Sequence, residues 1–166
     1  MNRLWAPWRA TYVEGAAKDE ASPCFLCDYW SRAETDGERG IVYRWQHWYA
    51  VLNAYPYTNG HLMLVLARHH EGFTGMTPSE AAELPAGLAA CESALRSAYA
   101  PHGLNLGVNM GRAAGAGAEG HLHIHLVPRW SGDTNFMTVV GETRVLPEEL
   151  AVTAARLRPI FEQLAT

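Results

Sequence analysis

Three histidines alternate with apolar residues in the segment HLHIHLV, which spans positions 121–127. Side chains at alternating positions of a β-strand point to the same face. A strand at this place therefore puts His121, His123 and His125 on one face and packs the leucine and isoleucine residues between them into a core on the other. Such a strand has to lie in a sheet that other elements cover, so this segment constrains the whole chain.

Four further segments have the composition of strands. Runs that are rich in β-branched and aromatic residues predict short strands where turn-forming residues separate them. One of them, HLMLVLA, is apolar almost throughout, which predicts burial on both faces of the sheet. The four predicted strands span residues 41–45, 49–55, 61–67 and 104–110.

Two helices complete the predicted elements. Thr77, Pro78 and Glu80 have the spacing of a capping box with a proline in the first turn, which predicts a helix over residues 77–99. Within it, Pro85 predicts a kink or a later start, because proline lacks the amide hydrogen. The second predicted helix is amphipathic and spans 147–165, with an apolar stripe of Leu150, Ala154, Leu157, Phe161 and Leu164.

Together these elements predict an α+β fold with a mainly antiparallel sheet of about five strands, one long central helix and a C-terminal helix. We expect a single domain over residues 1–166, because a chain of 166 residues is long enough for one substantial core and short for two. Residues 1–40 look irregular, and we expect them to form an N-terminal extension packed on the core.

Charge and composition limit the partners of the chain. The formal net charge of −4 gives no general attraction to nucleic acid. The longest apolar run is far shorter than a membrane span, and the first residues lack the apolar core of a signal peptide. We therefore expect a cytoplasmic protein that binds neither nucleic acid nor a membrane. Three cysteines in that compartment do not predict disulfides, and Cys91 is expected in the core.

The three histidines allow three interpretations: a solvent-facing polar stripe, a metal site, or a phosphate-reactive site. A single metal ion bound by all three is opposed by distance. His121 and His125 lie about 13 Å apart along a strand that rises about 3.4 Å per residue. Side chains that stand perpendicular to the strand do not converge over that distance on a zinc ion with bonds of about 2.1 Å.

The stretch before the histidines favours phosphate chemistry. Residues 109–120, NMGRAAGAGAEG, are rich in glycine, and such a loop lets backbone amides approach a phosphate closely. Imidazole, with an ordinary pKa of about 6.5, supplies an attacking nitrogen and hydrogen-bond donors near neutral pH. A glycine-rich loop alone is a weak signal, but one joined directly to three alternating histidines is a strong one.

At these residues the chain resembles the histidine triad (HIT) family, whose signature is His-x-His-x-His followed by two apolar residues. The segments LWAPWR, CFLC, LNAYPYTNGHLM, NMGRAAGAG, HLHIHLVPRW and GDTNFM, followed by ETRVLPEEL, resemble segments of bacterial members in the same order. These are similar to the branch that contains diadenosine polyphosphate hydrolases and phosphorylases. The resemblance implies a HIT-like fold and an enzyme that cleaves dinucleoside polyphosphates or related adenine nucleotides at the α-phosphate.

The resemblance also implies roles for the histidines. His123 would attack the α-phosphorus and form a covalent nucleotidyl-histidine intermediate, which water or phosphate then breaks. His125 would bind the α-phosphate oxygens, and His121 would order the nucleophile. An alternative from another class is a non-catalytic adenine-nucleotide-binding or signalling module.

Five further residues are candidate substrate contacts through the resemblance. His61 matches a histidine near the phosphates, although a strand-start histidine in a polar pocket is the alternative. Asn53 matches a residue that binds the ribose hydroxyls, and its alternative is a turn-forming asparagine. Asn109 matches an asparagine or glutamine that contacts phosphate, while Gly115 and Gly117 belong to the glycine-rich loop.

The chain departs from its relatives just before the first histidine. The phosphoramidate-cleaving branch has a serine or threonine there, which is thought to protonate the leaving amine. Residues 116–120 read AGAEG and offer no hydroxyl, which disfavours an aminoacyl-nucleotide substrate. Ala116 also replaces a glutamine that is common in several branches. The acid for the leaving group is therefore unassigned.

Cys24 and Cys27 form a Cys-x-x-Cys pair, which by itself is a weak zinc signal because a closed structural site needs four ligands. The resemblance supplies the other two: some HIT proteins complete the site with a histidine after the third strand and with the first triad histidine, which here are His69 and His121. His70 is adjacent and is an alternative to His69. Such a structural Zn²⁺ would pin the N-terminal segment to the sheet and orient His121. The alternative is a buried cysteine pair with no metal.

The resemblance finally implies a homodimer, in which two sheets join across the interface. Independent support comes from Trp5, Trp8 and Trp130, large apolar groups near expected surfaces that would otherwise leave exposed patches.

Overall fold

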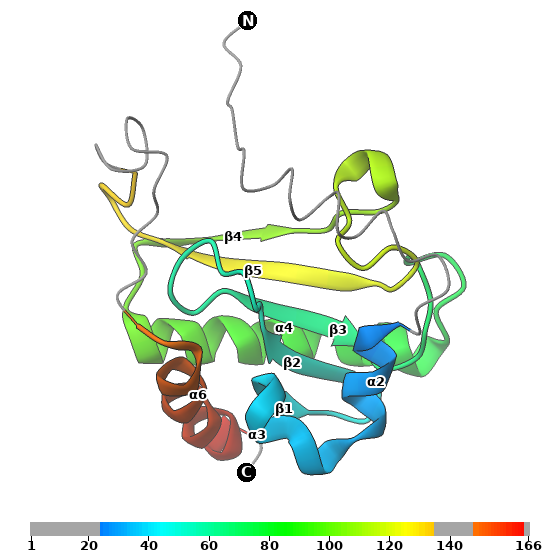
Figure 1. Cartoon of the computed structure of the whole chain (residues 1–166), viewed down its shortest axis with the longest axis horizontal. Coiled ribbons are helices and arrows are strands. Elements are labelled where there is room, and N and C mark those ends of the chain that lie inside the picture. Colours follow the sequence, from blue (N-terminus) through cyan, green and yellow to red (C-terminus); the bar gives the residue numbers. More distant parts are fainter. Residues whose placement is uncertain (1–23, 135–147, 165–166) are drawn as a thin grey trace, which may run out of the picture.

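The computed structural model describes residues 24–134 and 148–164. Its five strands form one antiparallel sheet in the order β1-β2-β3-β5-β4 (Figure 1). The strand with the histidines, β5, thus lies between β3 and β4 and pairs with both. The strands are β1 (Ile41–Arg44), β2 (Trp48–Leu52), β3 (Leu62–Leu66), β4 (Gly103–Gly107) and β5 (His123–Arg129). The predicted α+β fold with a five-stranded antiparallel sheet is confirmed.

One face of the sheet is covered by the long helix α4 (Pro78–Tyr99) and the C-terminal helix α6 (Leu150–Leu164) (Figure 1). The main core lies between these helices and the sheet. It takes Leu122, Ile124 and Leu126 from the strand side, as the alternation at the histidines predicts. Cys91 of α4 is fully buried in this core, as expected.

Helix α4 begins where its capping box predicts. The Thr77 hydroxyl accepts from the Glu80 amide at 3.2 Å, and the Glu80 carboxylate accepts from the Thr77 amide at 2.7 Å. The alternative of a later start at Pro85 is wrong, because the helix runs from Pro78 through Pro85 without interruption. Pro85 lies about two turns from the N-terminus and removes one backbone hydrogen bond, and burial of the helix in the main core outweighs this loss.

The C-terminal helix differs from the prediction at its ends. It begins at Leu150 rather than at residue 147, and residues 147 and 165 lie outside the described ranges. The middle of its apolar stripe is buried in the main core, but Leu150 and Leu164 are 37% and 47% exposed. The stripe is therefore longer than the face that the sheet and α4 cover.

The other face of the sheet carries a second, smaller core, in which Leu26 packs against Tyr49, Met63 and Val65. Leu26 belongs to a helix, α2 (Phe25–Ser31), that lies in front of the sheet in Figure 1. The expectation of an irregular N-terminal segment is therefore wrong for its described part. Residues 24–40 fold into α2, the 3₁₀ turn η1 (Ala33–Thr35) and α3 (Asp36–Arg39), while residues 1–23, with Trp5 and Trp8, lie outside the described ranges.

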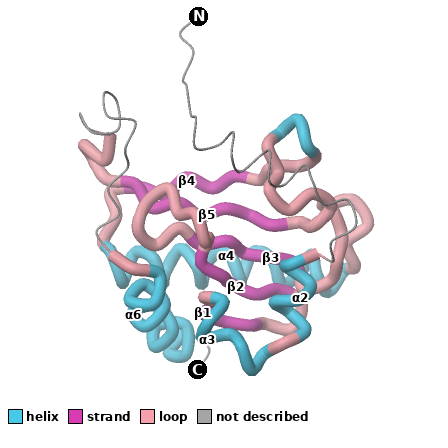
Figure 2. The backbone as a smooth tube through the Cα atoms, in the orientation of Figure 1, coloured by secondary structure: helices cyan, strands magenta, loops and turns pink. Residues whose placement is uncertain are grey.

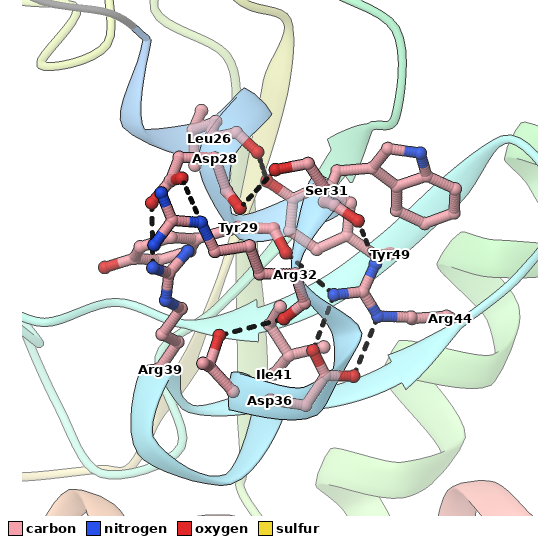
Figure 3. Close-up of polar contacts among 12 residues, drawn as sticks. Leu26, Asp28, Tyr29, Ser31, Arg32, Asp36, Arg39, Ile41, Arg44 and Tyr49 are labelled. Atoms are coloured by element: carbon pink, nitrogen blue, oxygen red, sulfur yellow. Dashed lines mark hydrogen bonds and ion pairs between the residues drawn. The ribbon is translucent and has the colours of Figure 1, made fainter.

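Arg44 fastens this helical segment to the edge of the sheet (Figure 3). Its guanidinium donates to both carboxylate oxygens of Asp36, at 2.7 and 2.5 Å. It also donates to the backbone carbonyls of Tyr29 and Trp30, at 2.7 and 2.8 Å, and lies 4.9 Å from the Trp30 ring centroid. These contacts satisfy the C-terminal carbonyls of α2 and fix the helix, and with it the Cys-x-x-Cys pair, over the second face of the sheet.

Among the described residues, no helix combines the length and the apolar character that crossing a membrane requires.

Candidate functional site

His123 and His125 of β5 lie on the face of the sheet that carries the second core, and His121 directly precedes this strand. His123 is paired with Val65 and His125 with Met63 on the neighbouring strand β3. His121 and His123 are buried, with 2% and 4% exposure, whereas His125 is half-buried. The three histidines therefore do not form a solvent-facing stripe. His121 lies at the buried end of the row, and His125 lies at the end that is partly exposed to solvent.

The hydrogen bond of His123 defines which of its ring nitrogens carries the hydrogen. Its Nδ1 lies 2.8 Å from the backbone carbonyl oxygen of His121. A carbonyl oxygen only accepts hydrogen bonds, so Nδ1 carries the hydrogen and donates it. In the neutral ring the lone pair is then on Nε2, which is the nitrogen that can attack an electrophile.

A chain of hydrogen bonds fixes His61 and His125 in the same way. The Tyr57 amide donates to Nδ1 of His61 at 3.1 Å, so the hydrogen of a neutral His61 ring is on Nε2. That Nε2 lies 3.0 Å from Nδ1 of His125 and donates to it. The hydrogen of a neutral His125 ring is consequently on its own Nε2, where it can be donated to a phosphate oxygen. His61 is thus 1% exposed yet part of a defined polar chain.

Asn53 lies directly after β2, at the start of the loop to β3. Its Oδ1 accepts from the Tyr55 amide at 2.9 Å, which is the turn-forming role that the sequence left open. Its Nδ2 lies 3.5 Å from Nε2 of His61, so the same side chain borders the polar chain.

The glycine-rich loop that leads into the triad contains the 3₁₀ turn η2 (Arg112–Ala114). Gly115 ends this turn with a φ of +82° and donates its amide to the Arg112 carbonyl at 3.0 Å. The Gly115 amide therefore forms its hydrogen bond within the loop, and Gly115 adopts the left-handed conformation that ends the turn. Asn109 and Gly117 are half-buried in the same segment.

The four predicted metal ligands lie together, at the closed end of the histidine row. One ligand atom each of Cys24, Cys27, His69 and His121 fall within 4.8 Å of one another. Nδ1 of His121 is 3.2 Å from Sγ of Cys24 and 3.5 Å from Sγ of Cys27, and Nδ1 of His69 is 3.4 Å from Sγ of Cys27. In a tetrahedral zinc site, bonds of about 2.3 Å to sulfur and 2.05 Å to nitrogen separate the two ligands by about 3.6 Å. The side chains therefore fit a zinc ion.

The tautomer of His121 suits this role. Its Nε2 lies 2.6 Å from the Leu66 carbonyl and donates to it, which leaves the lone pair on Nδ1, beside the two thiols. Burial lowers the pKa of His121, so the ring is neutral near neutral pH. Burial and the neighbouring Cys24 raise the pKa of Cys27 to about 11, and a bound cation would reverse that effect.

His70 lies outside this cluster, although it neighbours His69 in the sequence. Its Nε2 is 2.5 Å from the Thr74 carbonyl and donates to it within the loop between β3 and α4. Of the two alternatives, His69 is thus the residue that the fold brings to the cysteines.

Sequence reasoning missed two parts of the site. The Leu66 carbonyl, which selects the His121 tautomer, is a backbone group and leaves no trace in the residue type. Tyr57, whose amide orients His61 and whose ring centroid lies 4.5 Å from that of His61, was treated only as part of a turn. The available signal was an aromatic residue four positions before the histidine, inside a loop that is rich in turn-forming residues.

Comparison with known proteins agrees with this geometry. Residues 34–132 match the HIT domain family, and the chain belongs to that family. AP-4-A phosphorylase from Mycobacterium tuberculosis is 38% identical to it over 157 residues, which cover 92% of this chain and 80% of that protein.

Two solved structures share the fold. A zinc-bound histidine triad family protein from Mycobacterium smegmatis has a TM-score of 0.67 and 26% identity, over 86% of this chain and 95% of that chain. A hypothetical histidine triad nucleotide-binding protein from Sulfolobus tokodaii has a TM-score of 0.68 and 27% identity, over 85% of this chain and 93% of that chain.

Proposed function

We propose that the protein is a nucleotide hydrolase or nucleotidyltransferase that cleaves dinucleoside polyphosphates or related adenine nucleotides at the α-phosphate. The observation that carries this proposal is the buried His123, whose Nδ1 is bonded to a carbonyl and whose Nε2 is therefore left as a nucleophile. The relative named AP-4-A phosphorylase supports the choice of substrate.

In the first step, the Nε2 lone pair of His123 forms a bond to the α-phosphorus. The bond from that phosphorus to the bridging oxygen breaks, and its electron pair leaves with the remaining nucleotide. His125, whose Nδ1 lies 3.0 Å from Nε2 of His61, donates its Nε2–H to a non-bridging oxygen as charge builds there. No proton has to leave His123 through Nε2, because the lone pair is already on that atom.

In the second step, an incoming oxygen attacks the nucleotidyl-histidine and returns the electron pair to Nε2. Water as the attacker makes the protein a hydrolase and releases a nucleoside monophosphate. Inorganic phosphate makes it a phosphorylase and releases a nucleoside diphosphate, which is the outcome that the name of the relative favours. The remaining substrate contacts of the proposal are the ribose at Asn53 and phosphates near His61, Asn109 and the loop with Gly115 and Gly117.

A variant and a substrate panel test the proposal. The variant His123→Ala should lower turnover of diadenosine polyphosphates by at least about 1,000-fold while a nucleoside monophosphate still binds, because the nucleophile is lost and the pocket remains. His102→Ala is a matched control, since His102 is exposed and, within the described part of the chain, its ring hydrogen-bonds to Ser131 in the loop after β5. Assays with and without inorganic phosphate, read by the identity of the product, separate phosphorylase from hydrolase.

The same experiment distinguishes the alternative of a non-catalytic module. Such a protein would bind adenosine monophosphate and turn over no diadenosine polyphosphate, with or without phosphate. Near-normal turnover by His123→Ala would instead refute the covalent mechanism while leaving an enzyme.

We further propose that Cys24, Cys27, His69 and His121 hold one structural Zn²⁺. The cluster geometry and the His121 tautomer support this, as does the zinc-bound relative from Mycobacterium smegmatis. When bound, the ion would cross-link α2 to the sheet and would leave the chemistry at phosphorus to the histidines.

A homodimer is also part of the proposal. Strand β4 lies at an edge of the sheet, and its Leu106 is 53% exposed, as is Met110 just beyond it. An edge strand with exposed apolar side chains is a surface that a second copy can pair with. Size-exclusion chromatography with light scattering should give twice the mass of the chain, and a monomer at micromolar concentration would contradict it. The cytoplasmic location stays a prediction from the sequence.

A further inference from the structure

The loop between β2 and β3, residues 53–61, is held rigidly over the histidine face. The loop passes in front of β5 in Figure 2. The Thr58 hydroxyl donates to the carbonyl of Pro128 in β5 at 2.9 Å. The loop also closes on itself, because the His61 amide donates to the Thr58 carbonyl at 3.2 Å and the Asn53 amide to the His61 carbonyl at 3.0 Å. Residues at the tip of this loop therefore have defined positions.

Tyr57 is an aromatic residue of this loop that lies beside the triad. Its ring centroid lies 4.5 Å from that of His61 and 6.3 Å from that of His125, and it is within 25° of parallel to the His125 ring. At the same time 40% of the residue is exposed. An aromatic ring that is held at the surface, beside the donor for the phosphate, offers a flat apolar area on which another ring can stack.

The direction of the reaction brings part of the substrate to this ring. His123 is 4% exposed and attacks from the floor of the site, where the sheet lies behind it. The leaving oxygen is in line with the attacking nitrogen, so the leaving nucleotide points away from the sheet. The row is closed at His121 by the cluster with the two cysteines and is open at His125. A long leaving group therefore passes over His125 toward Tyr57.

We propose that Tyr57 is a specificity-determining residue that stacks on the base of the leaving nucleotide, so that the site prefers dinucleoside polyphosphates to mononucleoside polyphosphates. This inference rests on the proposed function and deepens it, because it assigns a place to the second nucleoside. Stacking of a base on an aromatic side chain changes affinity by about tenfold or more. That factor is absent when the leaving group carries no base.

The test compares two substrates with the same scissile bond and the same number of phosphates: diadenosine tetraphosphate and adenosine 5′-tetraphosphate. Tyr57→Ala should lower kcat/KM about tenfold for the dinucleoside, mainly through KM, and by less than about twofold for the mononucleoside. Tyr57→Phe should keep the activity on both, because the ring stacks and the hydroxyl does not. Phe73→Ala is a control of matched exposure, 43%, in the loop at the opposite end of β3, and should change neither rate.

Equal losses on both substrates would overturn the proposal, since Tyr57 would then act through His61 and His125. A loss in Tyr57→Phe as large as in Tyr57→Ala would also overturn it. Binding is measured separately by calorimetry in the His123→Ala variant, with and without Tyr57→Ala. If the unsubstituted protein turns over neither substrate, the proposed function fails, and the binding data still test the subsite at Tyr57. Dinucleoside binding that is about tenfold tighter and depends on Tyr57 supports the subsite, whereas equal or absent binding rejects it.

Discussion

Glu80 provides a test of how the segment that carries His69 is held. Its side chain is only 5% exposed, in the first turn of α4. The carboxylate accepts from Nε and Nη2 of Arg68, at 2.8 and 2.9 Å, and from the Thr77 amide at 2.7 Å. Arg68 directly precedes His69, so this ion pair ties the end of β3 to the central helix. The hydrogen bonds from Arg68 and from Thr77 outweigh the effect of burial and hold the pKa of Glu80 at about 2.

The variant Glu80→Gln removes the negative charge. It also replaces one carboxylate oxygen with an NH₂ group, which cannot accept the hydrogen bonds that Arg68 and the Thr77 amide donate. A pKa lowered from 4.5 to about 2 corresponds to about 3 kcal/mol of stabilisation at most. The partner Arg68 is 45% exposed, so solvent screening reduces this to about 2 kcal/mol. The lost charge-assisted hydrogen bonds give a similar figure. We expect the free energy of unfolding to fall by about 2 kcal/mol and Tm by about 4–8 °C.

The assay is urea or thermal unfolding of both proteins over a range of pH. A carboxyl with a lowered pKa stabilises the fold above its unfolded value and loses this effect as pH falls through the folded value. The difference between the two proteins should therefore be full near neutral pH and should shrink between pH 4.5 and about pH 2. Glu92→Gln is the control: its ion pair with Arg96 at 2.8 Å is half exposed and should be worth under about 0.5 kcal/mol. A difference below about 0.5 kcal/mol at neutral pH, or one that does not change with pH, would refute the reasoning.

Three further changes have defined outcomes. The protein should purify with about one equivalent of zinc, and Cys24→Ser should release it and lower Tm; elemental analysis and calorimetry measure both, and metal-free protein with two freely reactive thiols would leave an ordinary cysteine pair. Gly60→Ala should lower stability by about 2 kcal/mol, because Gly60 has a φ of +75° and an added Cβ would lie 3.0 Å from the Tyr99 ring. It should also reduce turnover, because Gly60 directly precedes His61; unchanged unfolding and kinetics would contradict this. Leu157→Ala, at a fully buried position of α6, should cost about 3 kcal/mol in urea unfolding with wild-type KM, and a loss below about 1 kcal/mol would show that α6 is not part of the cooperative core.

The sequence predicted the sheet well because its signals are local. Alternation at 121–127 and the apolar run 61–67 are read from neighbouring residues, and the structure confirms strands β5 and β3 there. Helix α2 was missed because it has only seven residues. Its apolar face is formed by Leu26, Tyr29 and Trp30, which is too short a pattern to establish a helical period. Its stability comes from distant partners such as Arg44, which propensity does not reveal.

The residue types at the site were also predictable, but their hydrogen bonding was not. Cysteines and histidines that are far apart in the chain were grouped through family resemblance, and the fold brings the four ligand atoms together. Which ring nitrogen of His121 or His123 carries the hydrogen depends on the carbonyls of Leu66 and His121. Every residue has a backbone carbonyl, so the sequence does not indicate that the carbonyls of Leu66 and His121 accept from these rings; only the folded backbone does.

His121 belongs to the proposed metal cluster and also contacts the proposed nucleophile, His123. Its ring faces the two thiols, while its backbone carbonyl accepts from Nδ1 of His123. That carbonyl belongs to the peptide unit that includes the Leu122 amide, and this amide donates to the His70 carbonyl at 2.6 Å. The Leu122 carbonyl in turn accepts from the Leu66 amide at 3.1 Å. Because backbone bonds on both sides hold this stretch, the tautomer of His123 does not depend on the metal. Loss of zinc should therefore loosen α2 and lower stability first, and should reduce turnover less than removal of His123 does.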